Sequence, residues 1–396
     1  MSNNAYITLM TKDVFLPGVL ILNESLRMVG SKYPLKCMIT EGLSEETLDV
    51  LRKVGVETIL VDKIPLPESI AKANMEIDPR LAMAWSDCLT KLNIFGLEGY
   101  DKLIFCDADL MILKNLDHCF EMPNLTAALD GEYEGLWPMW PHFNSGFMVL
   151  TPNTALKENI LDFANKLNPY ETLDFQGSRY TIADQEILNL YFCDWPEYKD
   201  LHLNKYYNVF APHLPASKND DVLNNAYFIH YVGQKPWSYP SPYKGTDEDN
   251  LFPYCVAYGL YKLIIKNALE PIDWSNIGTE LVESIFTVSI DDLFDIFTAK
   301  YFLQFLTNHP KYVTFKNIVD NNELCLKIAP HIKSMISIAR EQGDAKYSDL
   351  IYKSWFNIVD HLEDPHSRQV LLDVWKGIKD SICYFGSGKI FINENE

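Results

Sequence analysis

The sequence predicts an α/β domain with a largely parallel sheet, followed by an all-helical region. Between Ala5 and about Lys244, short runs of β-branched and apolar residues alternate with segments of helical periodicity, which is typical of β-α-β units. After a polar linker at 241–250 the strand-like runs stop, and amphipathic helical patterns continue to the C-terminus. We therefore expect two domains, residues 1–245 and residues 246–396, in a chain long enough to bury a core in each.

The first domain shows its expected elements in a regular order. Pro17 suits the first turn of a helix over 16–30, and apolar residues on one face predict a second helix over 45–54. Six segments are expected as strands: 5–11, 35–40, 57–62, 102–109 in the centre of the sheet, 143–152 and 226–232. Ligands bind such sheets at the carboxyl ends of the strands, so polar residues at those ends are the candidates for a site.

The second domain is expected to be a helical bundle. Ser289 and Asp292 form a capping-box pattern at the start of a helix that stops at Pro310. In the segment 346–362, the apolar side chains fall on one helical stripe. We interpret this stripe as bundle core.

Composition excludes several classes of partner. The formal net charge of −20 is unfavourable for nucleic acid, which is bound through clustered lysines and arginines, and for anionic membrane surfaces. The eight cysteines form no CxxC pair or zinc-type spacing, which favours a reducing compartment. No leader-like N-terminus and no apolar run of membrane-spanning length is present, so we expect a cytoplasmic chain without membrane insertion.

Two aspartates, Asp107 and Asp109, interrupt the apolar run KLIFCDADLMIL. Side chains two residues apart at a strand end point to the same face, so both carboxylates could hold one cation. Burying them without a cation would be costly, because an ionised oxygen loses its hydration in an apolar interior. A second acidic triplet, 247–249, lies in the polar linker and is interpreted as a solvated turn.

The motif FNSG at 143–146 places an amide and a hydroxyl, from Asn144 and Ser145, beside a glycine. The glycine allows close approach of the backbone, and the two polar side chains suit recognition of the hydroxyl groups of a sugar.

A third motif, HYVGQKPW at 230–237, combines a potential metal ligand with a potential phosphate site. His230 offers a nitrogen ligand that favours Mn²⁺ over Ca²⁺, with Mg²⁺ as the alternative. Gly233 permits close passage of the backbone past a phosphate, and Lys235 can neutralise its charge. A histidine alone would more often be a core residue, and the neighbouring Gly233 and Lys235 favour the ligand.

With these motifs assembled, the sequence resembles the glycogenin and galactinol synthase group of retaining family 8 glycosyltransferases. The resemblance extends from Ala5 to about Tyr239 and does not include the helical region. Its segments occur in the expected order: AYITLMTKDVFLPGVLILNESL for the nucleotide, LTKLNIF (89–95) with a lysine, FCDAD for the metal, FNSG for the sugar, DQEILN (184–189) for catalysis and HYVGQKPW for the third ligand and the phosphate.

The resemblance implies a GT-A fold, an α/β/α sandwich that binds a UDP-sugar. It implies a Mn²⁺ or Mg²⁺ ion on Asp107, Asp109 and His230. The other implied contacts are Leu9, Thr11, Lys12 and Phe15 at the uracil and ribose, Lys91, Asn144, Ser145, Asp184 and Gln185 around the sugar, and Gly233 with Lys235 at the departing phosphate. Lys91, Asp184 and Gln185 are the expected catalytic residues.

Retention of configuration requires either a covalent intermediate on a carboxylate or attack from the same face, guided by the leaving group. Asp184 is the only local candidate nucleophile, because the amide of Gln185 is a poor one.

The chain also departs from the family pattern. A single residue, Gln234, separates Gly233 from Lys235 where two are usual, and Thr181 replaces a frequent acid. Ala211 and His213 stand where self-glucosylated tyrosine would be expected, so we do not expect self-priming there.

We therefore expect a transferase that moves glucose, galactose, xylose or N-acetylglucosamine from UDP to a glycan or protein acceptor. The helical domain would recognise the acceptor or mediate homodimerisation. Trp137 and Trp140 are either an acceptor platform or packing residues. The alternatives are a UDP-binding interaction module with reduced catalysis and a metal-dependent UDP-sugar hydrolase.

Overall fold

The computed structural model describes residues 3–129, 142–174, 177–211 and 225–233, together with Lys235, Trp237 and Gln369. Apart from Gln369, the expected helical domain at 246–396 lies outside the described residues, with its capping box and apolar stripe. The acidic linker, Trp137, Trp140 and His213 lie outside them too.

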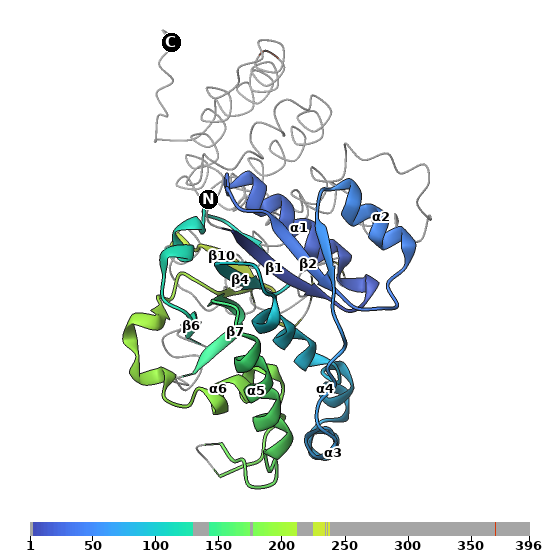
Figure 1. The fold of residues 1–396 in the computed structure, drawn as a ribbon, viewed down its shortest axis with the longest axis vertical. Coiled ribbons are helices and arrows are strands. Elements are labelled where there is room, and N and C mark those ends of the chain that lie inside the picture. The colour runs from blue at the N-terminus through green and yellow to red at the C-terminus, as the bar shows by residue number, and fades with distance from the viewer. Residues whose placement is uncertain are drawn as a thin grey trace, which may run out of the picture. The chain divides into compact units, whose positions relative to one another are not determined.

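The described part alternates strands and helices, as the sequence predicts (Figure 1). The strands are β1 Asn4–Met10, β2 Leu35–Ile39, β3 Glu57–Leu60, β4 Lys102–Cys106, β5 Leu110–Ile112, β6 Thr126–Leu129, β7 Phe143–Leu150, β8 His202–Leu203, β9 Val209–Phe210 and β10 Phe228–His230. The α-helices are α1 Leu16–Met28, α2 Glu45–Lys53, α3 Glu68–Ile77, α4 Pro79–Ala84, α5 Thr154–Lys166 and α6 Asp184–Tyr191. The 3₁₀-helices are η1 Asp13–Phe15, η2 Cys88–Gly96, η3 Asp117–Glu121, η4 Trp195–Glu197 and η5 Lys199–Leu201.

The main sheet is largely parallel, as the sequence predicts, and it becomes mixed through one reversed strand, β7. Its seven strands follow the order β3-β2-β1-β4-β7-β6-β8. The first four strands are parallel, as are β6 and β8, whereas β7 is antiparallel to both β4 and β6. The alternation of apolar segments in the sequence shows where the strands are but not their direction, because either direction buries the same side chains.

Local sequence accounts for most of the helix boundaries. Pro17 lies in the first turn of α1, where its missing N–H costs no helical hydrogen bond. The Ser44 side chain caps α2 by accepting a hydrogen bond from the Thr47 N–H, and acidic residues occupy the first turn of that helix. The LTKLNIF segment, which carries Lys91, lies within the 3₁₀-helix η2.

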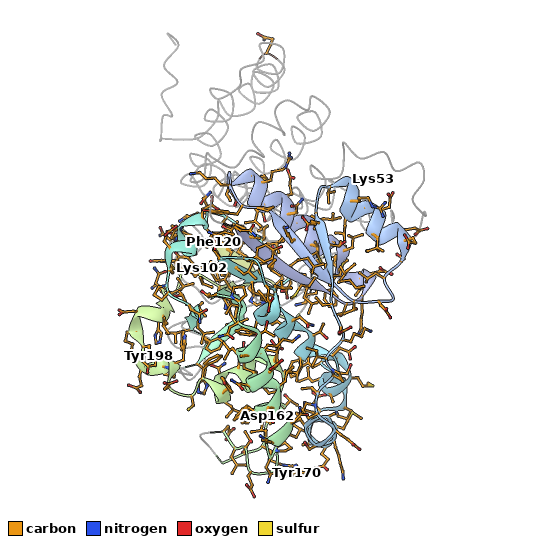
Figure 2. All side chains as sticks on the ribbon, in the orientation of Figure 1. Lys53, Lys102, Phe120, Asp162, Tyr170 and Tyr198 are labelled. Carbon is orange, nitrogen blue, oxygen red and sulfur yellow. The ribbon has the colours of Figure 1, made fainter. Side chains whose placement is uncertain are left out.

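Helices pack on both faces of the main sheet (Figure 1). α1 contacts β1, β2 and β5, whereas α5 and α6 contact η2, and α6 contacts β7. The strand order is consistent with this division. α1 and α2 lie in the steps from β1 to β3, and the chain then returns to β4 on the other side of β1, where crossovers of the same hand place helices on the opposite face. Alternate residues of the central strands, such as Ala5 and Ile7, join the core with η2, α5 and α6. Side chains fill the space between these layers (Figure 2).

A second sheet has three strands in the order β5-β10-β9. Its strand β5 is the next strand after β4 along the chain. β10 is antiparallel to β5 and parallel to β9. The Tyr231 N–H, directly after β10, donates to the Asp109 carbonyl with 2.9 Å between nitrogen and oxygen. This sheet therefore holds the end of β10 against the turn that follows β4.

Among the described helices, none is both long and apolar enough to cross a membrane. The described cysteines Cys37, Cys88, Cys106, Cys119 and Cys193 are all free thiols.

Candidate active site

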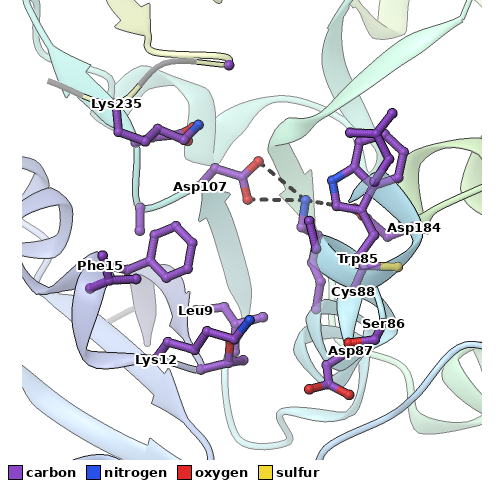
Figure 3. A pocket seen from close by; sticks show the side chains of 18 residues that line it. Leu9, Lys12, Phe15, Trp85, Ser86, Asp87, Cys88, Asp107, Asp184 and Lys235 are labelled. Atoms are coloured by element: carbon purple, nitrogen blue, oxygen red, sulfur yellow. Dashed lines mark hydrogen bonds and ion pairs between the residues drawn. The ribbon is translucent and has the colours of Figure 1, made fainter. Parts of the chain in front are cut away.

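An open pocket of about 600 Å³ lies at the carboxyl ends of β1 and β4 (Figure 3). This volume is within the usual range for sites that bind small molecules. Ten residues predicted from the sequence line it: Leu9, Thr11, Lys12, Phe15, Lys91, Asp107, Asp109, Asp184, Gly233 and Lys235. Of the remaining four, Ser145 and His230 contact these lining residues directly. Gln185 contacts Ser145, and Asn144 contacts Gln185.

Asp107, Asp109 and His230 form a compact cluster at this pocket. One ligand atom from each lies within 4.8 Å of the others. His230 Nε2 is 3.2 Å from Asp109 Oδ1 and 4.0 Å from Asp107 Oδ2. Two carboxylates and one imidazole nitrogen make a suitable donor set for Mn²⁺, with Mg²⁺ as the harder alternative.

The electrostatics of the two carboxylates also fit a divalent cation. Burial raises the pKa of Asp107, and the negative charge of Asp109 raises it further, against the opposing effect of Lys91. Burial acts in the same direction on Asp109, but Lys235 and His230 outweigh it and lower the pKa of that carboxyl. Asp107 thus carries an ionisation cost that a bound cation would offset.

Lys235 contacts the metal cluster directly. Its Nζ donates to Asp109 Oδ2 and to the Tyr231 carbonyl, the latter with 2.8 Å between nitrogen and oxygen. Gly233, two residues earlier, has a φ of +74°, a conformation that favours glycine. Lys235, which the sequence placed at a phosphate, is therefore paired here with Asp109, a predicted metal ligand.

Lys91 lies on η2 and connects the metal cluster to Asp184. Its Nζ is 2.7 Å from Asp184 Oδ2 and 3.1 Å from Asp107 Oδ1, and it donates to Ser145 Oγ at 3.1 Å. Only 7% of Lys91 is exposed. Burial opposes its charge, but Asp107 and Asp184 outweigh burial and raise the pKa of the ammonium group. Lys91 is therefore a buried cation between two carboxylates.

The FNSG segment meets the aspartates because β7 is antiparallel to β4. Cys106 pairs with Phe147, and the Asp107 N–H donates to the Gly146 carbonyl at 2.8 Å. A methyl group on Gly146 would lie 2.5 Å from His230 Cε1 and 3.0 Å from Asp107 Oδ2, so only glycine fits without displacement. The antiparallel direction of β7 thus places the start of β7 beside the end of β4.

Asp184 and Gln185 begin α6 and contact the same segment. Ser145 Oγ donates to Asp184 Oδ2 at 2.8 Å. Gln185 Oε1 accepts from Asn144 Nδ2 at 2.9 Å and from the Ser145 N–H at 3.1 Å. The amide of Gln185 is thereby used to position the FNSG backbone and side chain.

Several pocket residues were not identified from the sequence. Leu81 and Ala84 of α4, together with Trp85, Ser86, Asp87 and Cys88, form one wall (Figure 3). No local pattern marks this wall, because α4 comes to the pocket only through the packing of the segment between β3 and β4. Asn208, which contacts His230, was also missed, and it lies 22 residues away along the chain.

The comparisons with known proteins concern the same part of the chain. The sequence model of one family, Glycosyl transferase family 8, matches residues 6–240. Human glycogenin-1 is 33% identical over 247 residues, which cover 60% of this chain and 63% of the human protein. The putative UDP-glucuronate:xylan alpha-glucuronosyltransferase 5 of Arabidopsis thaliana is 32% identical over 235 residues, covering 59% of this chain and 36% of the plant protein.

Two solved structures are also similar. The glycosyltransferase GlyE of Streptococcus pneumoniae TIGR4 has 17% identity and a TM-score of 0.43, covering 71% of this chain and 63% of GlyE. The galactosyltransferase LgtC, with donor and acceptor sugar analogues, has 16% identity and a TM-score of 0.43, covering 70% of this chain and 99% of LgtC. Both TM-scores are below 0.5, so the family assignment depends on the sequence match.

Proposed function

The chain belongs to glycosyl transferase family 8 and is a glycosyltransferase, and we propose that it is a retaining enzyme that transfers a sugar from a UDP-sugar with the help of Mn²⁺. The proposed acceptor is a glycan or a protein. The proposed donors are UDP-glucose, UDP-galactose, UDP-xylose and UDP-N-acetylglucosamine, which differ in substituents that a few side chains recognise. A cytoplasmic location, and a GT-A architecture for the mixed α/β domain, are part of this proposal.

The observation that supports it most strongly is the cluster of Asp107, Asp109 and His230 at the pocket, with a lysine on each side. Asp107 contacts Lys91, and Asp109 contacts Lys235. Asp107, Asp109 and His230 would hold the cation, which when bound would neutralise charge on the diphosphate of the donor.

The pocket residues divide into two groups at the ends of this cluster. Leu9 lies near the end of β1, and Thr11, Lys12 and Phe15 follow the strand. These four residues are proposed to contact the uracil and ribose. On the other side, Lys91, Asp184, Ser145 and Gln185 form one hydrogen-bonded network. We assign this network, with Asn144, to the transferred sugar, because its carboxylate, hydroxyl and amides suit a group rich in hydroxyls.

Lys235 is proposed to bind the β-phosphate when UDP leaves. It lies close enough to Asp109 for an ion pair, so its ammonium group is within reach of any phosphate bound at the cluster. Negative charge grows on the β-phosphate as the glycosidic bond breaks, and a lysine there stabilises the transition state more than the ground state.

Asp184 is proposed to act at the anomeric carbon, as a nucleophile or by positioning the sugar for attack from the same face. Its Oδ2 accepts from Ser145 and contacts Lys91, and the residue is 9% exposed. The hydrogen bond from Ser145 and the contact with Lys91 fix the position of this carboxylate, which either role requires.

The two alternative functions use the same site. A binding module with reduced catalysis does not require Lys91, Asp184 and Ser145 to form a connected network, so their contacts favour catalysis. A hydrolase would use water in place of the acceptor, and product analysis separates it from a transferase.

We assign the catalytic unit to residues 1–245 and acceptor recognition to residues 246–396, with homodimerisation as the other role of the second unit. Deleting the residues after about Asn250 should then leave UDP-sugar hydrolysis largely intact while it reduces transfer. Loss of hydrolysis from a truncated protein that is still folded would contradict this division. Self-glucosylation is not proposed for the segment at Ala211, which has no hydroxyl group and is 1% exposed.

The first experiment is UDP release from a panel of UDP-sugars in Mn²⁺, Mg²⁺ or EDTA. We expect release from one donor that requires metal. Asp109→Ala should reduce kcat by about 10²- to 10³-fold or more, because it removes a ligand that stabilises developing charge. Asp49→Ala is the matched control, since Asp49 forms surface ion pairs on α2 with Arg52 and Lys53.

Full activity in Asp109→Ala, or release that does not respond to EDTA, would contradict the metal assignment. Absence of release from every donor, together with normal UDP binding by calorimetry, would favour the binding module.

A further inference from the structure

We propose that Asn208 is a positioning residue that fixes the ring of His230 in the tautomer needed to bind the cation. This inference rests on the proposed function, because it concerns the same metal cluster. Asn208 Oδ1 lies 2.7 Å from His230 Nδ1, and the two residues are 3% and 4% exposed. The contact is therefore shielded from water, which would otherwise compete for the imidazole nitrogen.

The second sheet brings the two residues together. Asn208 immediately precedes β9, and β9 is parallel to β10 with Phe210 opposite His230. His230 is the last residue of β10, and its Nε2 faces the two aspartates. One ring nitrogen thus faces Asn208 and the other faces Asp107 and Asp109.

The chemistry of an amide oxygen selects the tautomer. Asn208 Oδ1 can only accept, so the contact requires the proton on His230 Nδ1. The lone pair of the neutral ring is then on Nε2, which is available to a cation. With the amide reversed, Asn208 Nδ2 would donate to Nδ1 and the proton would move to Nε2, where it would block ligation.

The backbone at position 208 explains why asparagine suits this place. Asn208 has a φ of +59°, and among the described residues Leu125 is the other non-glycine with positive φ. Asparagine, aspartate and glycine tolerate this conformation better than other residues do. Of these, asparagine offers a neutral acceptor, aspartate a charged acceptor and glycine none.

These three residues make a matched series. Asn208→Gly keeps the backbone conformation and removes the acceptor, whereas Asn208→Asp keeps the conformation and an acceptor. A purely structural role at this turn would be preserved in both variants. A role in positioning His230 would be lost in Asn208→Gly and retained in Asn208→Asp.

The first readout is the tautomer of His230 in the metal-free protein. Full-length protein with ¹⁵N-labelled histidine is studied by NMR over a series of pH values, and the tautomer is assigned from the spectra in which the His230 ring is neutral. The His230 signals are identified by their loss in His230→Gln. We expect the proton on Nδ1 in the wild type and in Asn208→Asp. In Asn208→Gly we expect it to shift toward Nε2, because Asp109 Oδ1, 3.2 Å from that nitrogen, can then accept it without a competing acceptor at Nδ1. A wild-type ring protonated on Nε2, or the same tautomer in Asn208→Gly, would overturn the inference.

The second readout is the affinity for Mn²⁺ alone, measured by electron paramagnetic resonance of the free ion. We expect Asn208→Gly to bind Mn²⁺ about 10- to 100-fold more weakly, the usual effect of losing a partner of a metal-bound histidine. Asn208→Asp should bind at least as tightly as the wild type. Equal affinity in all three proteins would overturn this inference and leave the metal site intact. A wild type that binds no Mn²⁺ would instead overturn the proposed metal site, while the NMR result still decides the tautomer.

Discussion

Lys91 Nζ lies 2.7 Å from Asp184 Oδ2, in a contact that joins the 3₁₀-helix η2 to the first residue of α6. The same ammonium group is 3.1 Å from Asp107 Oδ1, so one buried lysine connects the proposed metal cluster to the proposed catalytic carboxylate. Lys91 therefore supplies a positive charge to both carboxylates of the pocket.

Replacing Lys91 by methionine should therefore affect both stability and catalysis. We expect the free energy of unfolding to fall by about 3–5 kcal/mol, the usual cost of removing one partner from a buried ion pair. We expect kcat to fall by about 10²- to 10³-fold, because the charge that orients Asp184 is lost. Urea denaturation and UDP release measure the two effects. Lys166→Met is the control, because Lys166 and its partner Asp162 form an exposed ion pair. Such pairs contribute only about 0–1 kcal/mol to the free energy of unfolding.

A second prediction concerns the pH dependence of stability without metal. Burial and Asp109 raise the pKa of Asp107, so the folded protein holds this proton more tightly than the unfolded chain does. The contribution of Asp107 to the free energy of unfolding is thus present at low pH and is lost as pH rises through the folded-state pKa. Asp107→Asn should be more stable than the wild type in EDTA at about pH 7. The difference should close as pH falls toward about 3.9, the ordinary pKa of aspartate.

Mn²⁺ should reverse this order, because it binds the folded wild type and raises its melting temperature, with a much smaller effect on Asp107→Asn. Thermal unfolding in EDTA and in Mn²⁺ at several pH values tests both statements. Lower stability of Asp107→Asn in EDTA at about pH 7 would contradict the first.

A third prediction concerns the glycine of FNSG. A methyl group on Gly146 would lie 2.5 Å from His230 Cε1, 2.8 Å from Asn144 Oδ1 and 3.0 Å from Asp107 Oδ2. Gly146→Ala should displace the metal ligands and weaken Mn²⁺ binding by about tenfold or more, equivalent to about 1.4 kcal/mol. Calorimetry or paramagnetic resonance measures this change.

The matched control for Gly146→Ala is Gly96→Ala. A methyl group on Gly96 would meet the flexible Lys157 side chain, with its Cδ at 3.1 Å. If both variants bound Mn²⁺ as the wild type does, the close packing at Gly146 would have no role in the site.

A fourth prediction follows from the ion pair of Lys235 with Asp109. The ammonium group and a metal ion compete for the same carboxylate, so Lys235→Met should bind Mn²⁺ alone more tightly, by up to about tenfold. The same variant should bind UDP more weakly in the presence of Mn²⁺, because a cation at the phosphate is lost. Lys235→Arg keeps the charge and serves as the control. Weaker binding of Mn²⁺ alone by Lys235→Met would show that the two cations do not compete.

The pairing of the two aspartates was predictable because it depends on one short segment. Asp107 and Asp109 are separated by one residue after an apolar strand, and this spacing alone predicts two carboxylates on one face. The structure brings both to His230, as the order of motifs suggested. By contrast, the sequence pattern contained no information that Lys91 would bridge Asp107 and Asp184, because that contact depends on how η2 packs against β4 and α6.

Sequence alone indicated six of the described strands, β1 to β4, β7 and β10, but not β5, β6, β8 and β9. It also indicated the helix starts at Pro17 and Ser44 and the residue types that meet at the pocket, because periodicity, capping and spacing are local properties. Tertiary structure alone decided the direction of β7, the wall at Trp85, the pairing of Lys235 with Asp109 and the contact between Asn208 and His230. The physical reason is that these contacts join residues far apart in the chain, and their geometry is set by the pairing of strands and the packing of helices on the sheet.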